Sequence, residues 1–136
     1  MIVVIDCNVI VSAGVSDGFV RRVLRRIIAE HEIIITADIV DEYAKVALYS
    51  KFSSQVSANI QSAIADVEGC AVLIEAVPCG IESPDPSDAP YIDAAIAGEA
   101  DYLITGNLKH FPDGTYGNVR VIGVRGFAEL AGMVSL

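Results

Sequence analysis

The sequence predicts an α/β protein: a three-layer α/β/α sandwich with a mainly parallel central sheet, formed as a single domain over residues 1–136. Short, branched, uninterrupted apolar runs alternate with longer segments in which apolar residues recur at helical spacing. In addition, 53% of the residues are hydrophobic, which suits strands buried on both faces. A chain of this length can bury a core without disulfides or a structural metal.

The first half of the chain gives two strands, each a run of branched apolar residues, and three helices, each with an apolar stripe. These are, in order, a strand at Ile2–Ile5 that ends at Asp6, a turn at 14–18, a helix at 19–30, a strand at 33–36, a helix with Asp38 as its N-cap and an apolar stripe to Leu48, and a helix at 54–67.

The second half is interpreted by the same criteria. It contains a strand at 70–75, an irregular connection marked by Pro78, Gly80, Pro84 and Pro86, a helix at 88–98, a strand at 102–105 closed by Gly106, a strand at 119–124 and helical turns at 127–131. No repeat or low-complexity tract is present, and no apolar run reaches the length of a membrane span.

Charge and cysteine content narrow the function classes. Eighteen acidic residues against nine basic ones give a formal charge of −9, which is unusual for a protein that coats nucleic acid and points instead to bound cations or a basic partner. Cys7, Cys70 and Cys79 have neither zinc-site spacing nor an even count, so a reducing cytoplasm is the expected location.

Four polar side chains are expected at the carboxyl edge of the sheet. Asp6 and Asn107 follow strands, Asp88 opens a helix, and Glu42 lies about one turn into another helix. Three carboxylates that are forced together repel each other, and a bound Mg²⁺ or Mn²⁺ would remove that penalty. The chemistry that follows is phosphodiester hydrolysis, for which attack by water is favoured over attack by the 2′-hydroxyl of RNA. The sequence does not decide whether the site binds one metal ion or two.

Three stretches carry a family resemblance. VVIDCNVIVSA resembles the opening strand of PIN-domain proteins, ADIVDEYAKVALYSKF is similar to their helix with a central glutamate, and SPDPSDAPYIDAAIAGEADYLITGNLKHF resembles their most diagnostic segment. The three stretches occur in the same order as in the family, and the resemblance covers nearly the whole chain. The resemblance is strongest to the toxin-like members, the toxins of VapBC-type toxin–antitoxin pairs and their relatives.

The resemblance implies a metal-dependent ribonuclease. Asp6, Glu42 and Asp88 would be the metal-binding acids, with Asn107 at a fourth position that is often Asp, and with Asn8 and Thr105 as supporting residues. It also implies an RNA substrate, a small antitoxin partner and a homodimer.

Two other functions remain open. One is a phosphatase of the haloacid-dehalogenase type with Asp6 as nucleophile, in which Thr105 and Lys109 would assist. Against it, this phosphatase type usually has a second acid two residues after the nucleophile, and the sequence DCN lacks that acid. Alternatively, the chain is a non-catalytic PIN-fold module for RNA binding or protein interaction. Arg21, Arg22, Arg25 and Arg26 are interpreted first as a solvated helix face and second as a contact for RNA or a partner. His110 is expected to be a surface loop residue.

Overall fold

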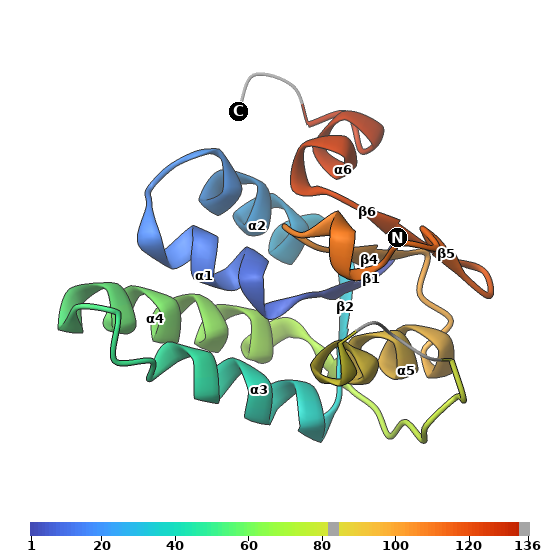
Figure 1. Cartoon of the computed structure of the whole chain (residues 1–136). Helices are drawn as coiled ribbons and strands as arrows, with labels where there is room; N and C mark the ends of the chain where they lie inside the picture. Colours follow the sequence, from blue (N-terminus) through green and yellow to red (C-terminus); the bar gives the residue numbers. More distant parts are fainter. Residues whose placement is uncertain (82–84, 134–136) are drawn as a thin grey trace.

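The computed structural model describes residues 1–81 and 85–133. Its centre is a six-stranded sheet (Figure 1). The strands are β1 (Ile2–Ile5), β2 (Glu32–Ile35), β3 (Val72–Leu73), β4 (Tyr102–Ile104), β5 (Thr115–Tyr116) and β6 (Val119–Ile122). They lie in the order β3-β2-β1-β4-β6-β5; β5 pairs antiparallel with β6, and the other pairs are parallel.

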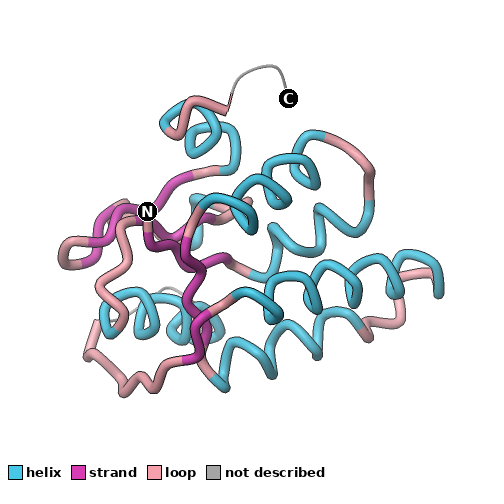
Figure 2. Tube along the Cα trace, turned by 180° about the vertical axis from the view of Figure 1, so that it is seen from behind, coloured by secondary structure: helices cyan, strands magenta, loops and turns pink. Residues whose placement is uncertain are grey.

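Helices flank the sheet, as Figures 1 and 2 show from opposite sides. They are α1 (Cys7–Val15), α2 (Phe19–Glu30), α3 (Ala37–Ala47), α4 (Ser54–Cys70), α5 (Ala89–Ala97) and α6 (Val124–Leu130), with short 3₁₀ turns η1 (Pro86–Asp88) and η2 (Leu108–His110). α5 packs on β1, β2 and β4, whereas α2 and α4 pack on β2 from the other side. Among the described helices, none is both long and apolar enough to cross a membrane.

The central strands are buried, as the uninterrupted apolar runs predict. Val3, Val4 and Ile5 of β1 and Leu103 and Ile104 of β4 are each 0% exposed. β1 and β4 are parallel neighbours, and Ile5 lies opposite Ile104. The residues that follow these two strands are therefore adjacent at the carboxyl edge of the sheet.

The main departure from the expected structure is α1, which occupies a segment for which no helix was predicted. Its sequence, CNVIVSAGV, has almost no polar face, because α1 packs against α2, α3 and α4 together. Gly14 is therefore not in the predicted turn but inside α1. A Cβ atom there would lie 2.4 Å from Ile60 Cγ1 and 2.9 Å from Ile60 Cα, so a residue without a side chain lets α1 and α4 approach this closely.

Smaller corrections concern element ends. Thr36, not Asp38, caps α3: its hydroxyl accepts a hydrogen bond from the Ile39 amide at 3.3 Å, and Asp38 lies in the first helical turn. The predicted strand at 70–75 is reduced to β3 because α4 continues to Cys70. The last strand ends at Ile122 and α6 begins at Val124. β5 is too short to show a pattern, and Pro84 of the predicted connection lies outside the described residues.

Candidate active site at the carboxyl edge of the sheet

Asp6 joins β1 directly to α1 without a loop. Its amide donates to the Ile104 carbonyl of β4 at 2.9 Å, which continues the strand pairing by one residue. Its side chain is 2% exposed and does not cap α1, although Asp6 occupies the N-cap position. The carboxylate is therefore buried at the sheet edge and available for contacts other than helix capping.

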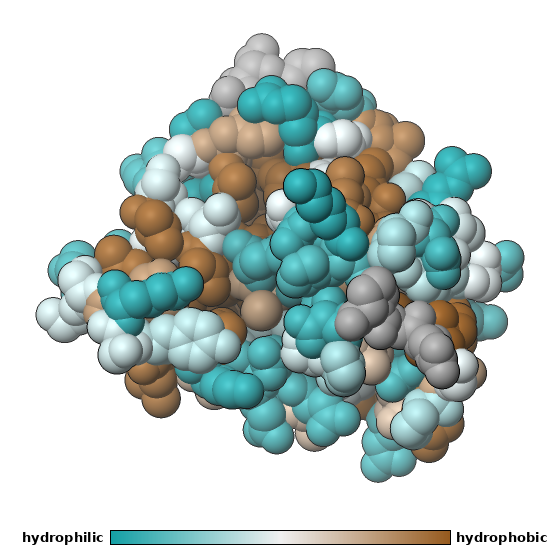
Figure 3. All heavy atoms as spheres, in the orientation of Figure 1, coloured by the Kyte–Doolittle hydropathy of each residue, from teal (hydrophilic) through white to brown (hydrophobic). Residues whose placement is uncertain are grey.

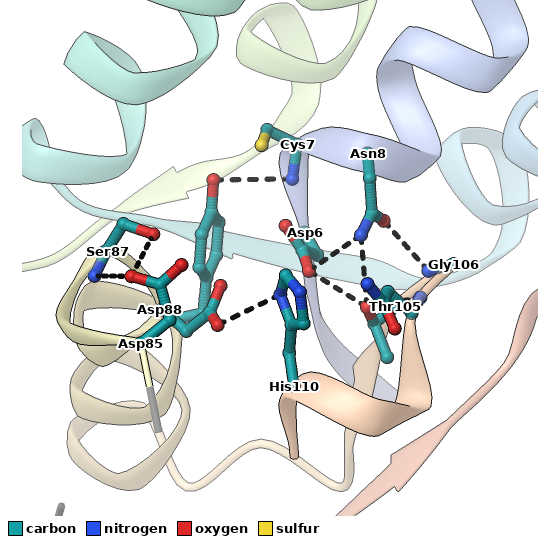
Figure 4. Close-up of polar contacts among 11 residues, drawn as sticks. Asp6, Cys7, Asn8, Asp85, Ser87, Asp88, Thr105, Gly106 and His110 are labelled. Atoms are coloured by element: carbon teal, nitrogen blue, oxygen red, sulfur yellow. Dashed lines mark hydrogen bonds and ion pairs between the residues drawn. The ribbon is translucent and has the colours of Figure 1, made fainter. Parts of the chain in front are cut away.

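Asn8 and Thr105 hold this carboxylate in place (Figure 4). The Thr105 hydroxyl donates to Asp6 Oδ2 at 2.8 Å, and the Asn8 amide nitrogen donates to the same oxygen at 3.2 Å. Asn8 Oδ1 in turn accepts from the Gly106 amide at 2.8 Å. These bonds link the start of α1 to the end of β4, so both predicted supporting residues orient Asp6.

Asp88 is the second buried acid. It lies where η1 passes into α5 and is 5% exposed, yet its carboxylate makes no capping bond. Asp85 caps this turn instead, by accepting from the Ser87 amide at 2.9 Å. Asp88 Oδ2 lies 3.1 Å from His110 Nδ1 without hydrogen-bond geometry. Among the described residues this buried oxygen has an ion-pair neighbour but no hydrogen-bond partner.

The surroundings of Asp6 and Asp88 disfavour the ionised form of both carboxyl groups. Burial raises the pKa of Asp6, and the hydrogen bond from Thr105 opposes the rise. Burial and then the charge of Asp6 raise the pKa of Asp88 to about 6, against an opposing effect of His110. A divalent cation between such oxygens would remove both penalties, and an oxygen-rich donor set is the kind that Mg²⁺ and Mn²⁺ prefer. The residues present thus fit a metal of that class.

Two buried tyrosines fix the junction between β1 and α1. The Tyr43 hydroxyl donates to the Ile5 carbonyl at 2.5 Å, and the Tyr91 hydroxyl accepts from the Cys7 amide at 3.3 Å. Neither tyrosine was singled out from the sequence, and this positioning role was missed. The available signal was a phenol on a buried stripe, since a buried hydroxyl needs a polar partner.

Glu42 and Asn107 are less closely tied to the two acids. Glu42 is half-buried on α3, and its charge contributes, after burial and the charge of Asp6, to raising the pKa of the Cys7 thiol to about 12. Its carboxylate makes no hydrogen bond or ion pair with any described residue. The amide of Asn107 donates to Thr105 Oγ1 at 3.0 Å, whereas its side chain bonds to none of the described residues.

His110 lies beside the acids and is only half exposed, contrary to the expectation of a plain surface loop residue. Ligand atoms of Asp85, Asp88 and His110 lie within 4.8 Å of one another. Within residues 1–81 and 85–133, this is the group of three His, Cys, Asp or Glu side chains that could hold a metal ion at this spacing. Asp6 and Glu42 do not belong to it. Sequence reasoning missed His110 because η2 is an irregular segment without any periodic signal.

The four arginines lie on α2 and have different environments. Arg21 Nε donates to the Ala13 carbonyl at 2.7 Å, at the end of α1, so this side chain supports the fold. Arg26 pairs with Glu30 at 2.9 Å within the same helix. Arg22 and Arg25 are exposed and make no hydrogen bond or ion pair with any described residue.

A largely apolar groove of about 650 Å³ begins at Thr105 and Gly106 and runs between α2, η2 and α6. The residues that line it include Phe19, Val20, Leu108, Val121 and Val124. Figure 3 shows hydrophobic surface in this part of the face and hydrophilic residues gathered beside it near its centre. An apolar surface therefore adjoins Thr105, a residue that bonds to Asp6.

Comparisons with known proteins agree with the α/β fold described above. A family model described as PIN domain matches residues 2–109. Among solved structures, a chain from the crystal structure of VapBC2 from Rickettsia felis, bound to a DNA fragment from their promoter, is similar to this chain. The TM-score is 0.61 and the identity 19%, and the match covers 90% of this chain and 98% of that chain. No curated protein sequence matches significantly.

Proposed function

Because the chain belongs to the PIN-domain family, we propose that it is a metal-dependent endoribonuclease that hydrolyses RNA phosphodiester bonds, and that it acts as the toxin of a toxin–antitoxin pair. The observation that carries the proposal is the pair of buried acids, Asp6 and Asp88, at the carboxyl edge of the sheet. Two such carboxylates are not buried near each other for stability, because burial disfavours the ionised form of both and the charge of Asp6 further disfavours ionisation of Asp88.

The proposed metal ligands are Asp6, Asp88 and Glu42, the last of which lies on α3. A bound Mg²⁺ or Mn²⁺ would neutralise charge on the scissile phosphate and stabilise the leaving oxygen. Thr105 and Asn8 hold the Asp6 carboxylate in a single orientation, and Tyr43 and Tyr91 hold the backbone beneath it. Asn107 lies at the rim, where its neutral side chain is positioned to contact substrate without adding charge.

The test uses purified protein with structured and single-stranded RNA in Mg²⁺, in Mn²⁺ and in EDTA. We expect cleavage that EDTA stops and that Asp6→Asn abolishes while the fold is kept. Asp41→Asn is the matched control, since Asp41 is an exposed acid on α3 that makes no hydrogen bond or ion pair with the described residues. Cleavage that persists in EDTA or in the Asp6→Asn variant would refute the proposal.

A non-catalytic PIN module is the second candidate, and Asn107 favours it, because an amide at this position removes one charge that a metal site could use. RNA binding without cleavage in either metal would support that function. The phosphatase alternative is disfavoured by the match to the PIN family. It predicts a phosphoryl group trapped on Asp6, and a denatured-protein mass measurement after reaction would detect it.

Partners and location are proposed from the similarity to VapBC2. We propose a cytoplasmic protein that forms a homodimer and is blocked by a small antitoxin. The apolar groove supports a protein partner, because its lining is suited to apolar side chains and includes Thr105, whose hydroxyl bonds to Asp6. Co-expression with the product of the neighbouring open reading frame, followed by size determination, tests both; a monomer that captures nothing would contradict them.

A further inference from the structure

His110 meets two aspartates of a single turn, Asp85 and Asp88, near Asp6. Asp85 precedes η1, Asp88 opens α5 and His110 ends η2, and one ligand atom of each lies within 4.8 Å of the others. Figure 4 shows the His110 ring beside the Asp88 carboxylate, to which a dashed line joins it, and below Asp6 in this view. The sequence analysis assigned His110 no role, and the proposed nuclease chemistry does not use it.

Asp88 and His110 form an ion pair whose two atoms are as close together as two ligands of one ion would be. Asp88 Oδ2 and His110 Nδ1 are 3.1 Å apart, yet the oxygen has no hydrogen-bond partner and Asp88 is 5% exposed. Two donors that each bind one ion at about 2.1 Å lie about 3.0 Å apart at the right angle of octahedral coordination, and about 3.4 Å apart in a tetrahedral zinc site. The observed separation matches the octahedral spacing without any movement of either side chain.

We propose that Asp85, Asp88 and His110 bind a transition-metal ion of the Mn²⁺, Co²⁺ or Zn²⁺ class, with Asp88 shared between this ion and the carboxylate site at Asp6. The inference rests on the proposed nuclease function in so far as it names the metal of that site. It predicts that the chain selects a transition metal over Mg²⁺, which PIN-type carboxylates alone do not require.

The selectivity follows from the donor atoms. Mg²⁺ prefers oxygen ligands and retains its water, whereas imidazole nitrogen favours first-row transition metals in the order Mn²⁺ < Co²⁺ < Zn²⁺. His110 is half exposed, so an ion can reach it from solvent. The strongly acidic chain, with a formal charge of −9, also favours cation binding in general, but only the histidine distinguishes one class of cation from another.

The experiment titrates the whole metal-free chain with Co²⁺ and, separately, with Mg²⁺ by calorimetry, for the original protein, His110→Gln and His31→Gln. His31 is the matched control: it is the other histidine of the chain, and it contacts the N-terminal amine, where Nδ1 lies 3.2 Å from the Met1 nitrogen. We expect His110→Gln to weaken Co²⁺ binding about ten-fold or more and Mg²⁺ binding about three-fold or less. His31→Gln should leave the tight Co²⁺ site unchanged.

A second measurement does not depend on a variant. Substoichiometric Mn²⁺ added to the original chain should broaden the ring proton resonances of His110 before those of His31. Equal Co²⁺ affinity in the original protein and His110→Gln, or broadening of His31 first, would overturn the inference. If RNA cleavage were nevertheless stopped by EDTA, the proposed nuclease would stand without this metal site. Tight Co²⁺ binding through His110 in a chain that cleaves no RNA would instead remove the proposed function and keep the site.

Discussion

Replacing Asp88 by asparagine should stabilise the metal-free protein. The pKa of Asp88 is raised from 3.8 to about 6, so folding disfavours its carboxylate form. The folded chain keeps a proton that the unfolded chain loses, so this contribution to stability is fully present below about pH 3.8 and is lost as the pH rises through about 6. At about 1.4 kcal/mol per pKa unit, the loss amounts to at most about 3 kcal/mol at neutral pH.

The assay is urea unfolding in EDTA between about pH 4 and pH 8, for the original protein, Asp88→Asn and the surface control Asp41→Asn. The stability gained by Asp88→Asn should grow between about pH 4 and pH 6 and remain constant above pH 7, because the penalty is then complete. Asp41→Asn should change the free energy of unfolding by about 0.5 kcal/mol or less. A saturating divalent metal should reverse the order, since it binds the folded original chain more tightly.

The reasoning would be refuted by an Asp88→Asn variant that is less stable than the original chain in EDTA above pH 7. The same holds for a gain that does not change with pH, because a merely structural effect of the amide would not titrate. Asp6 should show the same sign, since burial also raises its pKa.

Three further predictions concern the fold and its surface. Gly14→Ala should lower the free energy of unfolding by about 1–3 kcal/mol, measured in urea, because the new Cβ would lie 2.9 Å from backbone of α4. Tyr43→Phe removes the 2.5 Å hydrogen bond to the last carbonyl of β1 and should cost about 1–2 kcal/mol, with a larger fractional loss of RNA cleavage than of stability if the bond positions Asp6. Replacing Arg22 and Arg25 together by glutamine should weaken RNA binding and reduce its logarithmic salt slope by about 1.4 to 1.8, at about 0.7 to 0.9 per lost phosphate contact. An unchanged slope in a salt titration would show that RNA does not contact these two arginines.

The sheet could be predicted from the sequence because its pattern is local. β1 and β4 are uninterrupted apolar runs, and every residue after the first of each strand is fully buried. Once these strands are parallel neighbours, Asp6 and Thr105 must lie together, since each follows its strand directly. The juxtaposition of these two residues therefore needs only strand ends and topology.

The features that could not be predicted depend on contacts between distant segments. α1 has almost no polar face, because three helices surround it, and so it lacks the amphipathic signal that identified α2. Thr36 rather than Asp38 caps α3, since the strand ends one residue earlier than the pattern indicates. His110 reaches Asp88 only because η2 and η1 come together in the folded chain, and no spacing in the sequence records that approach.

The absence of a loop after β1 makes this junction intolerant of changes in chain length. One residue inserted between Asp6 and Cys7 would rotate the whole of α1 by about 100° relative to the sheet. Asn8 would then face away from Gly106, and the small side of α1 at Gly14 would turn away from α4. A single insertion at this point would thus disturb the acid site and the helix packing behind it together, whereas the exposed turn around Asp113 and Gly114 has room for added residues.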